Sequence, residues 1–116
     1  MDVEWVRRLC LAMPRVTESV QWGDNLVFKV AGKIFSIASL EPGPQWLSFK
    51  CSEEEAAELV ERPGIIPAPY LAKSHWVALE TRSALPAAEV RRLLKRSYEL
   101  VVAKLPAKTR AAMGAK

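Results

Sequence analysis

The sequence is poor in the residues that build metal sites, disulfide scaffolds and phosphate-binding loops. Its 116 residues include one histidine and two cysteines, Cys10 and Cys51, and their spacing is not typical of metal ligands. Its five glycines are scattered at positions 23, 32, 43, 64 and 114, so there is no Gly-rich phosphate loop. We therefore expect no metal, no cofactor and no catalytic residues, and a protein that is not an enzyme.

Long apolar runs are also missing. No stretch approaches the roughly 20 apolar residues of a membrane span, and the start, Met1-Asp2-Val3-Glu4, is acidic, unlike a secretory signal. We expect a cytoplasmic protein with reduced, unlinked thiols and no membrane partner. Half of the residues are hydrophobic and 26% are charged, proportions that predict one globular domain over residues 1–116.

Hydrophobic periodicity predicts an α+β fold. Apolar residues recur at helical spacing over 2–13, 52–61 and 86–105, and a period of two over 18–51 predicts three or four antiparallel strands. One more strand is expected over 75–81, whereas 65–70 is too rich in proline for a regular strand and is expected to be an ordered loop. The order α-β-β-β-(β)-α-β-α predicts one two-layer domain, an antiparallel sheet with helices on one face.

Local signals refine these elements. Ser52 and Glu55 form a capping-box pattern, and Ala31-Gly32 is a short reversal between two strands. Residues 108–113 are expected to add a further helical turn, and 114–116 to be frayed. We predict a single core from the apolar faces of these elements: Trp5, Leu9, Phe28, Phe35, Leu47, Phe49, Leu59, Val77, Leu79, Leu94 and Val101.

Positive charge is concentrated near the C-terminus. The chain carries a formal net charge of +4, and residues 86–116 hold eight basic and two acidic side chains. Four of these cations lie opposite the apolar stripe of the last long helix and could follow a row of phosphates: Arg91, Arg92, Lys95 and Arg96. The alternative is a solvated helix face with pairs within the helix, such as Glu89–Arg92 and Lys95–Glu99.

Four tryptophans are many for a chain of this length. If Leu47 and Val77 face the helices, strand alternation turns Trp46, Lys50 and Trp76 away from them, with Lys29 beside them. Such a face could stack bases and hold phosphates. Alternatively, the tryptophans pack under loops such as 63–74, because large rings usually bury most of their area.

Several short motifs, taken in order, resemble one family. Phe28-Lys29-Val30-Ala31-Gly32-Lys33-Ile34-Phe35 resembles the F-x-V-x-G-K-x-F hairpin of the MmcQ/YjbR family of small bacterial proteins, and Leu47-Ser48-Phe49-Lys50 resembles its next strand. Pro67-Ala68-Pro69-Tyr70 with Lys73-Ser74-His75-Trp76, and residues 97–106, resemble its later segments. The resemblance implies a CyaY-like, double-wing α+β fold, and members are commonly labelled DNA-binding.

These observations favour a non-enzymatic protein that binds nucleic acid, with DNA the first candidate. Phosphates would be neutralised by Lys29, Lys33, Lys50 and Lys73, with Trp46 or Trp76 stacking on bases and the four cations at 91–96 as an auxiliary contact. One alternative is a protein-interaction or chaperone-like domain that uses the sheet and could form a homodimer. Another is a small-molecule pocket near the segment 70–76, with Tyr70 and His75 as lining residues.

Overall fold

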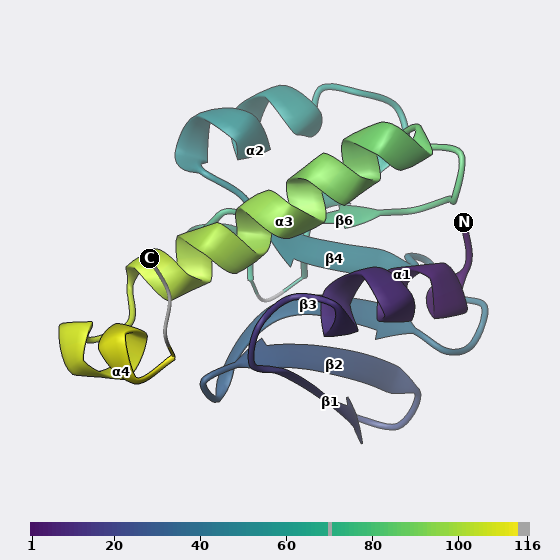
Figure 1. The fold of residues 1–116 in the computed structure, drawn as a ribbon. Coiled ribbons are helices and arrows are strands. Elements are labelled where there is room, and N and C mark those ends of the chain that lie inside the picture. The colour runs from purple at the N-terminus through teal and green to yellow at the C-terminus, as the bar shows by residue number, and fades with distance from the viewer. Residues whose placement is uncertain (70, 114–116) are drawn as a thin grey trace.

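In the computed structural model, which describes residues 1–69 and 71–113, one helix precedes a run of four strands, and further helices and strands follow (Figure 1). The described residues form these elements: α1 (Val3–Leu11), β1 (Val16–Gln21), β2 (Asn25–Val30), β3 (Lys33–Ser39), β4 (Leu47–Lys50), α2 (Glu53–Leu59), β5 (Ile65–Pro67), the 3-10 turn η1 (Ala72–Ser74), β6 (Trp76–Leu79), α3 (Ala87–Ala103) and α4 (Ala107–Ala112). The predicted α+β class is confirmed.

All strand pairs are antiparallel, in the spatial order β1-β2-β3-β4-β6-β5. The expectation of a loop over 65–70 is wrong for its first half, because Ile65–Pro67 pairs with β6 as strand β5. Proline has no backbone N–H to donate. It is tolerated in β5 because β5 is the edge strand and has a neighbouring strand on one side only.

The ends of the first two helices follow the sequence signals. The Asp2 carboxylate accepts a hydrogen bond from the Trp5 backbone N–H at 2.8 Å, which satisfies one of the free donors of the first turn of α1. Ser52 and Glu55 form the predicted capping box at the start of α2. Ala31 and Gly32, with φ of 50° and 78°, make the tight turn between β2 and β3. Residues 114–116, expected to be frayed, lie outside the described residues.

The main core lies between the sheet and the helices α1, α2 and α3, which cover the same face (Figure 1). Every residue of the predicted core belongs to it, with Trp5 and Leu9 at its margin. Ser97 fastens α3 to the sheet, because its buried hydroxyl donates to the Phe35 carbonyl at 2.6 Å and accepts from the Lys50 N–H at 2.9 Å. The longest helix is therefore held by polar contacts to β3 and β4 as well as by apolar packing.

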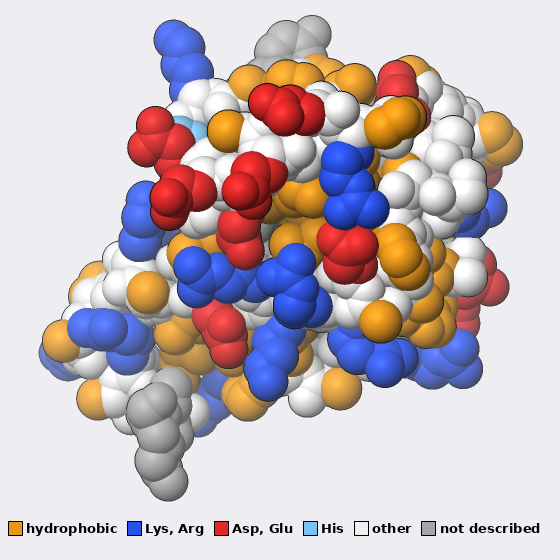
Figure 2. Space-filling model, turned by 90° about the horizontal axis from the view of Figure 1, so that it is seen from above, with side chains coloured by type: hydrophobic (Ala, Val, Ile, Leu, Met, Phe, Trp, Pro, Cys, Tyr) orange, Lys and Arg blue, Asp and Glu red, His pale blue; other side chains and the backbone are white. Residues whose placement is uncertain are grey.

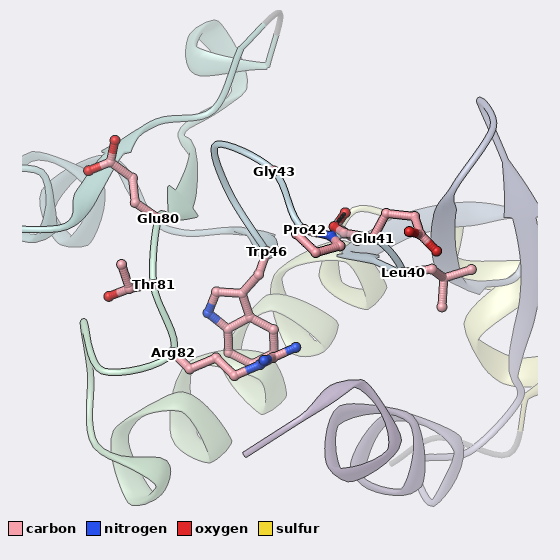
Figure 3. Close-up of a pocket in the computed structure, with 9 residues that line it drawn as sticks. Leu40, Glu41, Pro42, Gly43, Trp46, Glu80, Thr81 and Arg82 are labelled. Atoms are coloured by element: carbon pink, nitrogen blue, oxygen red, sulfur yellow. Dashed lines mark hydrogen bonds between the residues drawn. The ribbon is translucent and has the colours of Figure 1, made fainter.

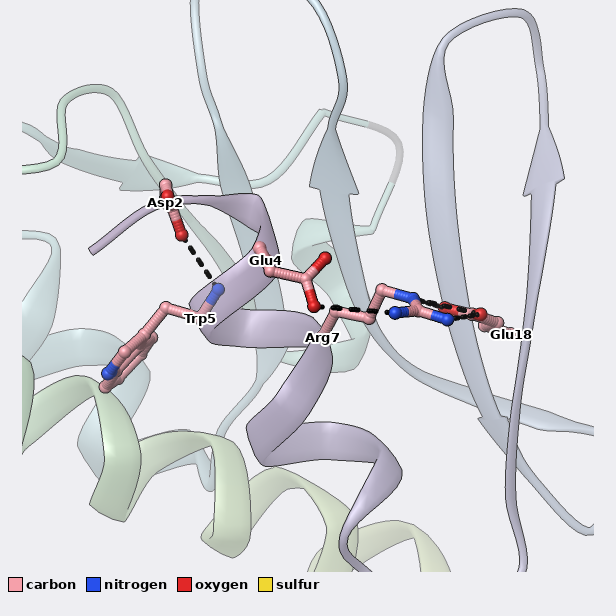
Figure 4. A network of polar contacts seen from close by, with 5 residues as sticks. All are labelled: Asp2, Glu4, Trp5, Arg7 and Glu18. Carbon is pink, nitrogen blue, oxygen red and sulfur yellow. Dashed lines mark hydrogen bonds and ion pairs between the residues drawn. The ribbon is translucent and has the colours of Figure 1, made fainter.

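An ion pair joins α1 to the edge strand β1 (Figure 4). The Arg7 guanidinium donates to both carboxylate oxygens of Glu18, from Nε and Nη2 at 2.8 Å each, and Nη1 reaches Glu4 at 3.5 Å. Glu18 projects from β1 toward the helices and is half-buried. This two-point geometry fixes the direction of the pair more strongly than a single contact does.

Both thiols are free and belong to the main core. Burial raises the pKa of Cys10 from 9.0 to about 12. Burial also raises the pKa of Cys51 to about 12, with a further contribution from the carboxylate of Glu55. Because the thiolate is the reactive form, neither cysteine has the character of a nucleophile.

Among the described residues, the opposite face of the sheet carries no α-helix, only the short 3-10 turn η1, and it buries fewer apolar side chains. Its apolar cluster consists of Ala68, Trp76 and Ala78, with Ile34 and Ile37 partly buried against them. The chain from β5 to β6, which includes η1, folds back over this part of the sheet and contributes Leu71 to the cluster. We call this surface the helix-free face.

Candidate nucleic-acid interface

Cations from distant parts of the sequence gather at one end of the sheet. Strands β2 and β4 end there, and β3 and β6 begin there, so Lys33 of the β2–β3 turn and Lys50 at the end of β4 lie at the same end. The C-terminal end of α3 and the short helix α4 reach the same end (Figure 1). We call this group the basic end: Arg15, Lys29, Lys33, Lys50, Lys73, Lys104, Lys108 and Arg110.

Two hydrogen bonds hold members of the basic end against neighbouring segments of the chain. The Lys50 ammonium donates to the carbonyl of Ser74 at 2.9 Å, directly after Lys73. Partial burial lowers the pKa of Lys50, and the nearby charge of Lys104 lowers it further. On the other side, Arg15 donates to the Ala112 carbonyl at 3.2 Å, which brings α4 against the start of β1.

The basic end and the outer face of α3 differ in how their charges are compensated. None of the eight cations of the basic end forms an ion pair with a carboxylate of the described residues. On α3, by contrast, Arg92 and Arg96 lie 3.7 and 3.6 Å from Glu55, and Arg91 lies over the ring of Trp5. Acidic side chains border the basic ones over α2 and α3 (Figure 2).

The predicted exposure of α3's basic strip is confirmed, but its ion pairs are not those within the helix. Glu89 pairs with Arg62 at 2.8 Å instead of with Arg92, which turns to Glu55 of α2. No ion pair is formed by Lys95 among the described residues. Because α2 packs beside α3, it supplies the carboxylate of Glu55, which the sequence of α3 alone does not contain.

The two tryptophans expected to stack on bases are buried. Trp76 is 6% exposed and lies in the cluster of the helix-free face, under the chain that follows β5, as the alternative interpretation predicted. Trp46 is 7% exposed, and the expectation that it faces away from the helices is wrong, because it belongs to the main core. It precedes β4, where strand alternation does not apply, and Arg82 lies 5.2 Å over its ring (Figure 3).

The two remaining predicted residues are His75, whose backbone shapes a turn, and Tyr70. His75 has a left-handed backbone, with φ of 64°. Its N–H donates to the Ala72 carbonyl at 3.0 Å, and its carbonyl accepts from the Cys51 N–H at 2.9 Å. These contacts join η1 to the end of β4, so the position serves the turn. Tyr70 lies outside the described residues.

One aromatic residue that the sequence reasoning missed is Trp22, in the β1–β2 turn. Its side chain is 64% exposed, and its backbone has φ of 51°. It borders a hollow of about 470 Å³ on the helix-free face, lined by Trp22, Asn25, Ile37, Gln45, Ser48, Ala68, Pro69 and Leu71. The signal was available: Trp22-Gly23-Asp24 is a turn sequence between two strands, and a turn cannot bury a large ring within the sheet.

Within 1–69 and 71–113, no group of three or more His, Cys, Asp or Glu side chains could hold a metal ion. No helix in this part of the chain has the length and apolar character needed to cross a membrane.

The comparisons with known proteins define the family. The YjbR family model matches residues 11–100, and the chain belongs to this family, as the resemblance predicted. It is 31% identical over 102 residues to the uncharacterized protein YbdF of Escherichia coli O157:H7, covering 85% of this chain and 83% of that one.

Solved structures agree with this assignment. The crystal structure of Deinococcus radiodurans protein DR2400, which has a DUF419 domain, is similar with a TM-score of 0.89 and 30% identity, covering 99% of this chain and 89% of that one. A protein from Pseudomonas syringae shares the fold, with a TM-score of 0.69 and 22% identity, over 86% of this chain and 98% of that one.

Proposed function

We propose that this protein binds nucleic acid without enzymatic chemistry, through phosphate contacts made by the basic end. The observation that carries the proposal is the gathering of eight cations that no carboxylate of the described residues neutralises. When lysine and arginine side chains neutralise phosphates, the nucleic acid releases the counterions condensed on it, and this release drives binding. Besides partial burial, the nearby charge of Lys104 lowers the pKa of Lys50, and an anion bound between these two cations would relieve their repulsion.

The geometry favours a partly different set of proposed phosphate contacts from the one that the sequence pattern suggested. Lys29, Lys33, Lys50 and Lys73 keep their proposed role, and Arg15, Lys104, Lys108 and Arg110 join them. Arg91, Arg92 and Arg96 have partners within the protein, so phosphates would have to displace those partners. The α3 strip is therefore the weaker of the two candidate contacts.

Two variants of equal charge separate the two surfaces. The first replaces Lys33, Lys73, Lys104 and Lys108 with Gln, and the second replaces Arg91, Arg92, Lys95 and Arg96 with Gln. Each removes four positive charges, so the formal net charge falls from +4 to 0 in both. Fluorescence anisotropy with labelled duplex and single-stranded DNA, at several salt concentrations, measures affinity and its salt slope.

We expect the basic-end variant to lose more affinity on both DNA forms, and its salt slope on the duplex to fall by roughly 0.9 for each lost contact. An equal loss in the two variants would assign binding to net charge and contradict a defined surface. A wild-type protein that binds neither form at low salt would reject the proposal and favour the protein-interaction alternative, whose apolar contacts are not weakened by salt in this way.

A further inference from the structure

The hollow on the helix-free face has an aromatic residue, Trp22, at its rim. The Trp22 ring is exposed, although the backbone conformation at this position disfavours bulky residues. The Asn25 side-chain amide donates to the Trp22 carbonyl at 3.2 Å and closes the turn around it. The turn therefore places an exposed indole at the rim of a cavity.

The lining of the hollow indicates the chemistry of its occupant. Ile37 and Leu71 are apolar, whereas Asn25, Gln45 and Ser48 supply uncharged donors and acceptors. No charged side chain lines the hollow among the described residues. This combination suits a neutral, planar ring with a polar edge, which is the chemistry of a nucleobase. Its volume of about 470 Å³ is within the usual range of small-molecule sites.

The hollow and part of the basic end share one face of the sheet. Asn25 and Lys29 point to the same side of β2, four residues or roughly 13 Å apart along the strand. Ser48 and Lys50 point to that side of β4, two residues or about 7 Å apart. When the phosphates of a nucleic-acid strand contact these lysines, the neighbouring nucleotides of that nucleic-acid strand are therefore within reach of the hollow.

We propose that the hollow receives one unpaired base of a bound single strand, with its ring against Trp22 and its polar edge against Asn25, Gln45 and Ser48. This inference rests on the proposed nucleic-acid binding and gives it a preference, because a base paired within a duplex cannot enter the hollow. Trp22 thereby takes the stacking role that Trp46 and Trp76 cannot perform.

The test compares Trp22 variants on a single-stranded oligonucleotide and on the duplex of the same sequence. Trp22→Asn removes the ring, and Asn adopts a left-handed backbone more readily than most residues. Trp22→Phe keeps an aromatic face. The matched control is Leu40→Asn, which changes an exposed apolar residue in the loop after β3 that does not line the hollow. Thermal melting confirms that each variant is folded.

We expect Trp22→Asn to weaken single-strand binding by about 5- to 150-fold, which corresponds to ~1–3 kcal/mol for the stacking of one base. Duplex affinity and the salt slope should stay unchanged, Trp22→Phe should keep most of the single-strand affinity, and Leu40→Asn should resemble wild type. Unchanged single-strand binding in Trp22→Asn, or an equal loss on the duplex, overturns the base site and leaves phosphate binding intact. Wild-type protein that binds neither form refutes the proposed function itself, and this inference with it.

Discussion

The two faces of the sheet differ in how much they bury their side chains. On the helix-covered face, Phe28, Phe35 and Phe49 are fully buried in a core that three helices complete. On the helix-free face, the buried cluster of the described residues consists of Ala68, Trp76 and Ala78, and this face also carries lysines and an open hollow. A sheet that is stabilised from one side can thus leave the other side available for a ligand.

The largest loss of stability should come from truncating the buried tryptophan of the cluster on the helix-free face. Trp76→Ala should lower the free energy of unfolding by ~3–5 kcal/mol, because the ring is almost fully buried and its removal leaves a cavity. Chemical denaturation measures the change. A variant that keeps wild-type stability but loses affinity for single strands would restore Trp76 as a stacking residue and erase the contrast between the two faces.

The core of the helix-covered face is tested by Leu94→Ala in α3. Leu94 is completely buried, so its truncation should cost ~2–5 kcal/mol in a denaturant titration. Affinity for DNA should be unchanged under conditions where the variant is folded, since Leu94 is on the side away from the hollow. A midpoint equal to that of wild type would show that the inner face of α3 has been assigned incorrectly.

A smaller effect is expected from Ser97→Ala, which removes the polar link between α3 and the sheet. The Lys50 N–H and the Phe35 carbonyl would lose their shared partner, and an unsatisfied buried polar group costs ~1–3 kcal/mol. Ser97→Cys, which keeps a weak donor of similar size, serves as the control. If the Ser97→Ala variant is as stable as wild type, apolar packing alone holds α3 against the sheet.

The thiols of the main core should be slow to react at neutral pH. With the pKa of Cys10 raised from 9.0 to about 12, alkylation of the native protein at pH 8 should be about a thousandfold slower than in denaturant, because far less thiolate is present. The unfolded chain ionises first, so the stability from these neutral thiols is complete below about pH 9 and is lost between about pH 9 and 12. Rapid native labelling by iodoacetamide would contradict their burial.

Local patterns in the sequence predicted the fold well, because caps, periodicity and turns act over a few residues. Ser52 with Glu55, and Ala31 with Gly32, were sufficient to place a helix start and a strand turn. The same reasoning missed β5, since whether a strand lies at the edge, where Pro67 is harmless, depends on the order of the whole sheet.

The candidate site was predictable only in part, for the same physical reason. The sequence singled out Lys33 and Lys50, but their proximity to Lys104 and Arg15 depends on where α3 ends and how α4 folds back. Ion pairs between α2 and α3 likewise require both helices in place. Strand alternation gave the wrong side for Trp46 because it was applied one residue beyond the strand.

The ion pair of Arg7 with Glu18 has a consequence for how copies of this protein meet one another. A strand at the edge of a sheet can recruit a second strand and start aggregation. β1 carries a charged residue directed inward and held by α1, and the other edge, β5, has three residues and ends at Pro67. Charged inward residues, short length and proline all discourage such recruitment. Both borders of the sheet thus carry features that disfavour edge-to-edge pairing between copies of the protein.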